Sequence, residues 1–212
     1  MNDFNSIILL CVILLNFFIL GTSRLAACIR VTGFQGGLLS LLPPVIHGLT
    51  FHTMFLAGTA LVIKGFVIPW LLMRAIRQVH IRREIEPRIG YVATLMIGAL
   101  TTAGAFIFAD RLPLLPQHLH SLFIPASLST MAAGFLMLIT RRKAITQVAG
   151  YLIFENGIFI FGILLAEAMP FMVEAGILLD ILVAIFVMGI VMNHINREFS
   201  STNTENLCLL KE

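Results

Sequence analysis

The feature that most constrains this 212-residue chain is a series of long apolar runs separated by short polar segments. An α-helix of about 20 apolar residues crosses the ~30 Å hydrocarbon core of a bilayer. In lipid, backbone N–H and C=O groups must bond within the protein, so only helices or closed barrels are stable. The runs are too long and too continuous for barrel strands. The sequence therefore predicts an all-α, polytopic membrane helix bundle.

Composition leads to the same class. The chain is 58% hydrophobic and only 12% charged, whereas a soluble domain is about 45–50% apolar and about 25% charged. Too little polar surface remains to cover a soluble globule. The net charge of +3 comes with Lys and Arg clustered between apolar runs, which is a signal of membrane topology rather than of nucleic-acid binding. The N-terminal MNDFNS has no basic segment, so we interpret the first run as a retained helix, not a signal peptide.

Seven apolar runs can be counted, which predicts six to seven transmembrane helices. The second run is short, contains Gly33, Gly36 and Gly37, and ends at Pro43-Pro44. It is open whether this run is a complete span, a broken or re-entrant helix, or an extension of the first. The runs cover residues 4–22, 31–45, 49–73, 89–109, 119–139, 144–165 and 171–195.

The basic residues predict the orientation. With seven spans, four basic segments fall on one side of the membrane, and only Arg111 lies on the other. The positive-inside rule then places the N-terminus outside and the C-terminus in the cytoplasm, with residues 197–212 as a polar cytoplasmic tail. We expect the cytoplasmic (inner) membrane of a bacterium or archaeon. The basic segments contain Arg24, Arg30, Arg74, Arg77, Arg82, Arg83, Arg88, Arg141, Arg142, Lys143 and Arg197.

Three ionisable residues lie well inside apolar runs: Lys64, Glu155 and Asp180. At 1.5 Å per helical residue, each is roughly 15–22 Å from the cytoplasmic end of its run, so the three share about one depth. Intramembrane charges usually face a bundle interior or water, and a carboxyl group in a dry site can exchange a proton near neutral pH. The pattern predicts a path for protons or ions. The competing interpretation is a buried ion pair that only fixes helix register, and either carboxylate could pair with Lys64.

Other polar residues are weaker candidates. Glu167 and Glu174 flank Pro170 in the predicted external turn, where a solvated carboxylate is the simpler interpretation, and His52 lies at the outer end of the third run. We keep these three as secondary groups for the ion path. The chain has no HExxH, CxxC, phosphate-loop or GxSxG motif, so we expect neither a metal site nor a catalytic centre in this chain alone.

Glycines in the sixth run predict close helix packing. We expect Gly150, Gly157 and Gly162, with Gly176 and Gly189 in the seventh run, to allow a tight approach of these two runs, which would bring Glu155 near Asp180. Alternatively, Gly157 beside Glu155 marks a π-bulge or a local opening of the helix, a feature that often accompanies function.

The stretch from Leu119 to His194 resembles the K-type subunit of respiratory complex I and the C subunit of Mrp cation/proton antiporters. The likeness is carried by a tight basic turn at Arg141-Arg142-Lys143, by Glu155 midway along the next helix, and by Asp180 midway along the helix after that. Asp180 stands where those families usually have glutamate. With several helices ahead of this module, including the segment LLNFFILGTSRLAACIRVTGFQGGLLSLLPP, the chain resembles hydrogenase-4 component E.

The resemblance divides the chain into N-terminal membrane helices (1–118), a three-helix K-type module (119–196) and the tail (197–212). It implies a non-catalytic membrane subunit of a [NiFe] hydrogenase or formate hydrogenlyase complex. The partners would be lipid, antiporter-like and heel membrane subunits, and a soluble arm that holds the [NiFe] centre and iron–sulfur clusters. This chain would bind no cofactor itself. Its acidic residues would contribute to a proton or sodium path coupled to electron transfer. The alternatives are a subunit of an Mrp-type antiporter, or a structural membrane scaffold.

Overall fold

The computed structural model describes residues 2–79, 88–112, 122–165 and 189. The regular elements in these ranges are helices, which confirms the predicted all-α class. In chain order they are α1 (Asn2–Gly21), α2 (Leu25–Ser40), α3 (Leu42–His47), α4 (Phe51–Ala60), the π-helix η1 (Leu61–Val67), α5 (Ile68–Val79), α6 (Tyr91–Asp110), α7 (Phe123–Thr140) and α8 (Ala144–Leu165).

Six helical stretches in the described part of the chain are long and apolar enough to cross a membrane, so this is a multi-pass membrane protein. They match the first six predicted runs. The predicted seventh span, 171–195, lies outside the described residues except for residue 189, and the tail lies wholly outside them. The six stretches are Phe4–Gly21, Leu25–Ile46, Thr53–Arg74, Tyr91–Asp110, Phe123–Thr140 and Ile145–Ile163.

The second span differs from its prediction. It begins at Leu25 rather than at residue 31, and it is 22 residues long, enough for a complete crossing. It is therefore not short, and its length fits a complete span. Arg30, expected in the loop, lies within α2 with its side chain exposed, while Cys28 and Ile29 beside it are buried. Of the alternatives left open, the structure shows an interruption near the prolines: α2 ends at Ser40, and α3 begins at Leu42, one residue before Pro43-Pro44.

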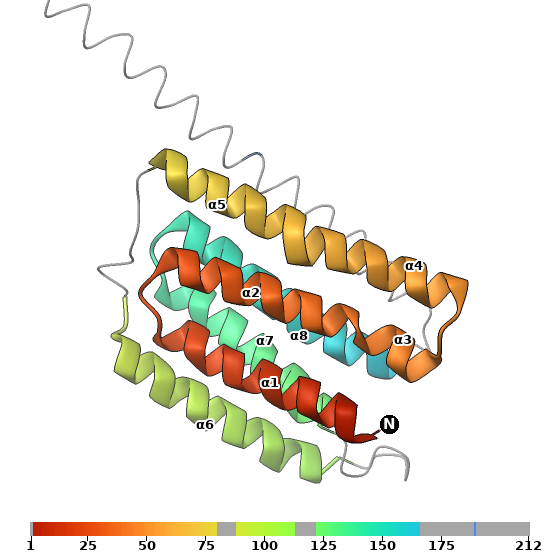
Figure 1. The fold of residues 1–212 in the computed structure, drawn as a ribbon. Coiled ribbons are helices and arrows are strands. Elements are labelled where there is room, and N and C mark those ends of the chain that lie inside the picture. Colours follow the sequence, from red (N-terminus) through yellow and green to blue (C-terminus); the bar gives the residue numbers. More distant parts are fainter. Residues whose placement is uncertain (1, 80–87, 113–121, 166–188, 190–212) are drawn as a thin grey trace, which may run out of the picture.

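Two helical hairpins form the centre of the bundle. Figure 1 shows α1 and α2 running antiparallel, with α7 and α8 behind them. The stretch α4–η1–α5 packs against α2, and α6 packs against α1 and α7. The helices of the second hairpin approach most closely, because glycines replace side chains at their contact. A Cβ atom on Gly134 would lie 2.3 Å from the backbone N of Phe154, and one on Gly157 would lie 2.6 Å from the backbone N of Met131. Gly150 and Gly157 thus face α7, whereas a Cβ on Gly162 would meet nothing within 4 Å.

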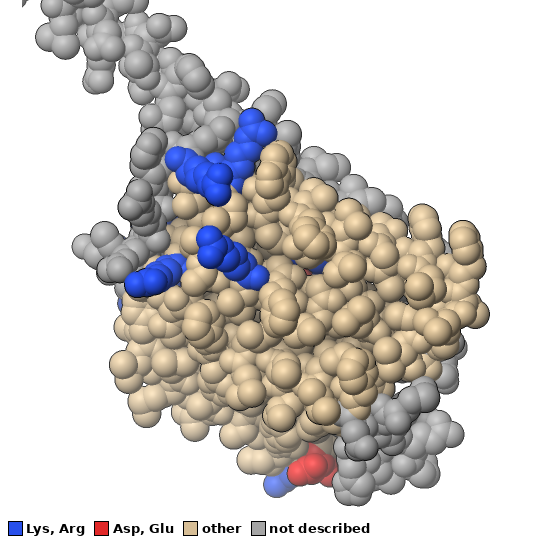
Figure 2. Space-filling model, viewed as in Figure 1, with Lys and Arg blue, Asp and Glu red and all other residues tan. Residues whose placement is uncertain are grey.

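Basic residues gather at one end of the bundle (Figure 2). The side chain of Arg141 is buried there: its Nη2 donates to the carbonyl of Leu20 at 2.7 Å, and its guanidinium lies 4.3 Å from the centre of the Tyr91 ring. It joins the end of α1, where the helix dipole is negative, to the start of α6. Of the predicted basic turn, Arg142 is exposed, but Arg141 is an internal anchor. Arg111 lies at the opposite end, after α6.

Candidate functional site

Lys64 and Glu155 form an ion pair inside the bundle. Lys64 Nζ lies 2.9 Å from Glu155 Oε1, and the two side chains are only 7% and 4% exposed. The Phe159 ring, one turn beyond Glu155 on α8, has its centre 5.0 Å from the same Nζ. Lys64 comes from the middle of the span Thr53–Arg74 and Glu155 from the middle of Ile145–Ile163. Among the described residues, the structure thus pairs Lys64 with Glu155.

The local sequence explains how Lys64 reaches the core. Pro69 has no N–H and its ring crowds the carbonyl four residues earlier, so a regular helix is disturbed just before it. The preceding turn is a π-helix, and the N–H of Ile68 donates to the carbonyl of Ile63, five residues back. Lys64 lies in this widened turn. The prediction of a π-bulge at Gly157 was wrong: α8 is α-helical there, and the wide turn is at Leu61–Val67 instead.

Glycines of α2 make room for this turn. A Cβ atom on Gly36 would lie 2.9 Å from the Cβ of Lys64, and one on Gly33 would lie 2.4 Å from Cγ of Pro69. Small residues of this kind let helix backbones approach closely in membranes. The glycines of the second run, which left a broken helix open as an interpretation, therefore allow the Lys64 segment to pack closely against α2.

A chain of hydrogen-bonded polar side chains lies beside the ion pair. Asn156 Nδ2 donates to Gln35 Oε1 at 3.4 Å, Gln35 Nε2 donates to Asn16 Oδ1 at 2.9 Å, and Asn16 Nδ2 donates to Thr130 Oγ1 at 2.9 Å. All four side chains are buried, and they come from α8, α2, α1 and α7. Each amide donates in the same direction along the chain. Buried polar groups need such partners, because an unpaired one costs about 1–3 kcal/mol.

Apolar clusters enclose this polar layer on both sides. Towards the basic end, Ile19, Cys28 and Ile153 belong to one buried cluster, and Leu25, Ile29 and Leu72 belong to a second. Towards the other end, a third cluster contains Ile13, Leu39, Ala126 and Ile160. In sequence, each polar residue stands between members of opposite clusters on its own helix. The layer therefore crosses the bundle sideways, within an apolar interior.

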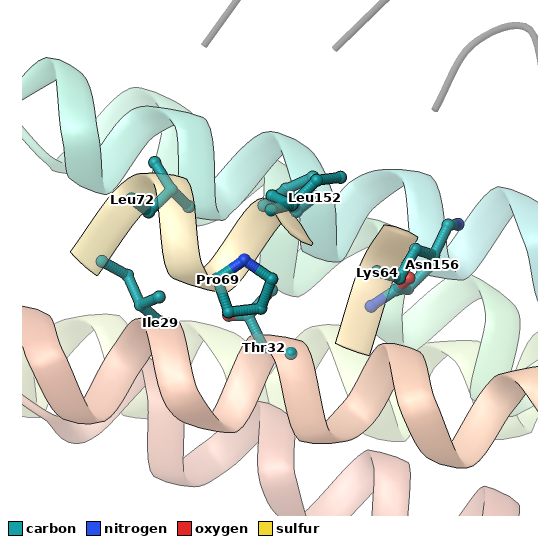
Figure 3. A pocket seen from close by; sticks show the side chains of 9 residues that line it. Ile29, Thr32, Lys64, Pro69, Leu72, Leu152 and Asn156 are labelled. Atoms are coloured by element: carbon teal, nitrogen blue, oxygen red, sulfur yellow. The ribbon is translucent and has the colours of Figure 1, made fainter. Parts of the chain in front are cut away.

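A small cavity adjoins Lys64. It has room of about 10 Å³, close to the minimum for one water molecule. Figure 3 shows Lys64 and Asn156 at one end of it, and Ile29 and Leu72 at the other. The other walls are apolar except for Thr32, whose hydroxyl donates to the carbonyl of Cys28. A single water molecule there would have Lys64, Asn156 and Thr32 as its polar neighbours.

The predicted site residues have different outcomes. Lys64 and Glu155 are brought together as described. Asp180, Glu167 and Glu174 lie outside the described residues, so the placements of Asp180 near Glu155 and of Glu167 and Glu174 in an external turn stay predictions. His52 is the second residue of α4. Within the described ranges, no three His, Cys, Asp or Glu residues could share a metal ion.

The amide chain was not predicted from the sequence, because only ionisable residues within the apolar runs were considered as site residues. A usable signal was present: Asn16, Gln35 and Asn156 each interrupt an apolar run near its middle. Amides in hydrocarbon must find partners in the protein, as charges must. Their common depth would have predicted a polar layer shared by several helices.

Two sets of known proteins are similar to this chain. The uncharacterized protein Rv0085 of Mycobacterium tuberculosis is 28% identical over 204 residues, which cover 94% of this chain and 92% of that protein. Hydrogenase-4 component E of Escherichia coli K12 is 26% identical over 157 residues, covering 73% of this chain and 72% of that protein, and the Shigella flexneri protein of the same name matches equally. No family model and no solved structure matches the chain.

Proposed function

We propose that this chain is a non-catalytic membrane subunit of a hydrogenase-type complex, of which formate hydrogenlyase complexes are one kind. The observation that carries the proposal is a pair of opposite charges at mid-span, Lys64 with Glu155, in a chain similar over most of its length to hydrogenase-4 component E. The [NiFe] centre and iron–sulfur clusters would belong to soluble partner subunits, and antiporter-like and heel subunits would be the membrane neighbours. In keeping with the positive-inside rule, the basic end would face the cytoplasm.

Within such a complex, the ion pair would respond to proton or sodium movement. A proton or cation that neutralises Glu155 removes the counter-charge of Lys64, and in an apolar interior an uncompensated charge is costly. The pair therefore links the charge of one span to that of another. Asp180, with a depth close to that of Glu155 in the sequence, is proposed as the next group of the path. Glu167, Glu174 and His52 are proposed only as secondary groups near the outer surface.

The amide chain would position the pair rather than conduct. Side-chain amides have no ionisable proton near neutral pH, and Asn156, Gln35 and Asn16 each donate a hydrogen bond to the next side chain of the series. They fix α8 against α1 and α2, next to Glu155. The charge change would thus be confined to the ionisable groups.

The first experiment identifies the complex. The chain is purified with an affinity tag in mild detergent, and the proteins that accompany it are identified by mass spectrometry. Recovery of a [NiFe] hydrogenase large subunit with antiporter-like subunits is the expected result. Antiporter subunits without any metalloprotein would replace the proposal with an Mrp-type antiporter, and recovery of the chain alone would exclude both.

The second experiment tests the ion path in that complex. In complexes that co-purification shows to be assembled, Glu155→Gln should keep hydrogenase activity with an artificial electron acceptor and abolish coupled ion translocation in membrane vesicles. Glu155→Asp, which keeps the carboxylate, is the matched control and should retain part of the coupling. The double variant Glu155→Gln with Lys64→Met separates the remaining alternative. If the pair only fixes helix register, this neutral pair will translocate ions normally.

A further inference from the structure

Four exposed arginines lie on or next to α2 and α5, two helices that pack against each other. Arg24 precedes α2 and Arg30 lies within it, while Arg74 and Arg77 lie in the second half of α5. Their neighbours in sequence, Leu25 and Ile29 on α2 and Ile76 on α5, share one buried cluster, which holds the two helices together at this end. Figure 2 shows positive side chains over the N-terminal half of α2 and the C-terminal end of α5.

Arg30 is placed unusually for a charge. The second span begins at Leu25, so Arg30 lies about 7.5 Å inside it at 1.5 Å per residue. Its side chain is nevertheless exposed on the outside of the bundle. An arginine at this depth is stable when its long side chain reaches the headgroup level and meets an anion. Arg74 is the last residue of the span Thr53–Arg74 and marks that level on α5.

The acidic residues of the described ranges do not supply this anion. Asp3 and Asp110 belong to the opposite end of the bundle, at the start of α1 and the end of α6, and Glu155 is buried beside Lys64. The arginines therefore form a positive surface that these carboxylates do not neutralise.

The exposed face of α5 carries a second indication. Trp70 is 59% exposed, and the Arg74 guanidinium lies 5.6 Å from the centre of its ring. Trp70, Arg74 and Arg77 follow at helical spacing and share one face. Tryptophan is enriched at the boundary between hydrocarbon and headgroups. The combination of an interfacial tryptophan with arginines fits a lipid headgroup better than it fits an aqueous anion.

We propose that Arg24, Arg30, Arg74 and Arg77 bind the phosphate of an anionic phospholipid at the basic end of the bundle. Guanidinium groups bind phosphate oxygens through two parallel hydrogen bonds, and basic clusters between helices at this level recognise anionic headgroups. The bound lipid would fill the outer side of the α2–α5 contact and neutralise Arg30. This inference requires only that the chain spans a membrane, and it does not depend on the proposed complex.

The test measures bound lipid on the purified full chain. The protein is exchanged into detergent containing equal amounts of phosphatidylglycerol and phosphatidylcholine, and retained lipid is counted by native mass spectrometry. The double variant Arg30→Gln with Arg74→Gln should lose roughly tenfold in preference for phosphatidylglycerol. The matched control, Arg111→Gln with Arg142→Gln, removes two exposed arginines elsewhere and should keep the preference. Size-exclusion chromatography and circular dichroism verify that both variants are folded.

Three outcomes would overturn the proposal. An equal loss in both double variants would reduce the effect to general charge attraction. Protection against thermal unfolding by millimolar inorganic phosphate, equal to that by phosphatidylglycerol, would assign the arginines to a free anion. An unchanged lipid preference in the Arg30→Gln, Arg74→Gln variant would mean that the arginines do not bind lipid, and would favour an acidic protein as their partner.

Discussion

Lys64 Nζ and Glu155 Oε1 lie 2.9 Å apart, although one residue belongs to the π-helix η1 and the other to the middle of α8. Neither residue could be buried alone at small cost, because a single charge in an apolar interior has no compensation. The pair is therefore the point at which two separate spans depend on each other. Phe159 closes the same space over the ammonium group.

The ion pair predicts that a single substitution lowers the free energy of unfolding more than the double substitution does. Lys64→Met leaves Glu155 without its counter-charge and should lower the free energy of unfolding by about 3–5 kcal/mol. Adding Glu155→Gln should recover most of that loss, since no charge is then buried. Unfolding of the detergent-solubilised variants, followed by circular dichroism, measures both. Losses that simply add would contradict the pairing.

The amide chain predicts that substitutions of its members lower the free energy of unfolding in a non-additive way. Gln35→Leu removes the acceptor of Asn156 and the donor to Asn16, so it should destabilise the protein by about 1–3 kcal/mol. Asn16→Leu breaks part of the same chain, and the double variant should cost less than the sum of the two single variants. The same unfolding assay measures this difference. Full additivity would mean that the three amides do not act together.

The close contact between α7 and α8 predicts that a glycine-to-alanine substitution lowers the free energy of unfolding at the contact but not at open positions. Gly134→Ala and Gly157→Ala place a methyl group within 2.6 Å of backbone atoms, and overpacking of this kind costs about 1–3 kcal/mol. Gly162→Ala and Gly104→Ala meet nothing within 4 Å, so they should be neutral or stabilising by up to about 1 kcal/mol through helix propensity. Thermal unfolding distinguishes the two groups. A destabilised Gly104→Ala variant would remove the packing explanation.

The close packing of the Lys64 segment against α2 predicts a similar difference between glycine substitutions at this contact and at an open position. Gly33→Ala and Gly36→Ala should push the η1 segment away from α2, because the added methyl groups would meet Pro69 and Lys64. We expect a loss of about 1–3 kcal/mol and, if the ion pair serves the proposed path, weaker ion coupling in the assembled complex. Gly58→Ala, in α4 with nothing within 4 Å of the new Cβ, is the control. An unaffected Gly36→Ala variant would show that this approach is not required.

Some features could be predicted from residues alone. The apolar runs predicted six described spans within a few residues at most ends, since the need to satisfy the backbone in lipid acts on each run independently. The same approach failed at Arg30, where a charge was taken to end a helix. Snorkelling allows an arginine to lie inside a span with its charge outside the hydrocarbon, so the span begins at Leu25.

The sequence by itself determined the class of protein, the six described spans, and the burial of Lys64 and Glu155, because the hydropathy of a run reflects whether lipid or water surrounds it. Only the tertiary structure decided which polar groups meet. Whether Glu155 reaches Lys64, and whether Asn16, Gln35, Thr130 and Asn156 join in one chain, depends on how each helix is rotated about its axis and how closely helices approach. Those rotations are set by contacts between distant segments, such as the glycines of α2 against the widened turn before Pro69, and no single run encodes them.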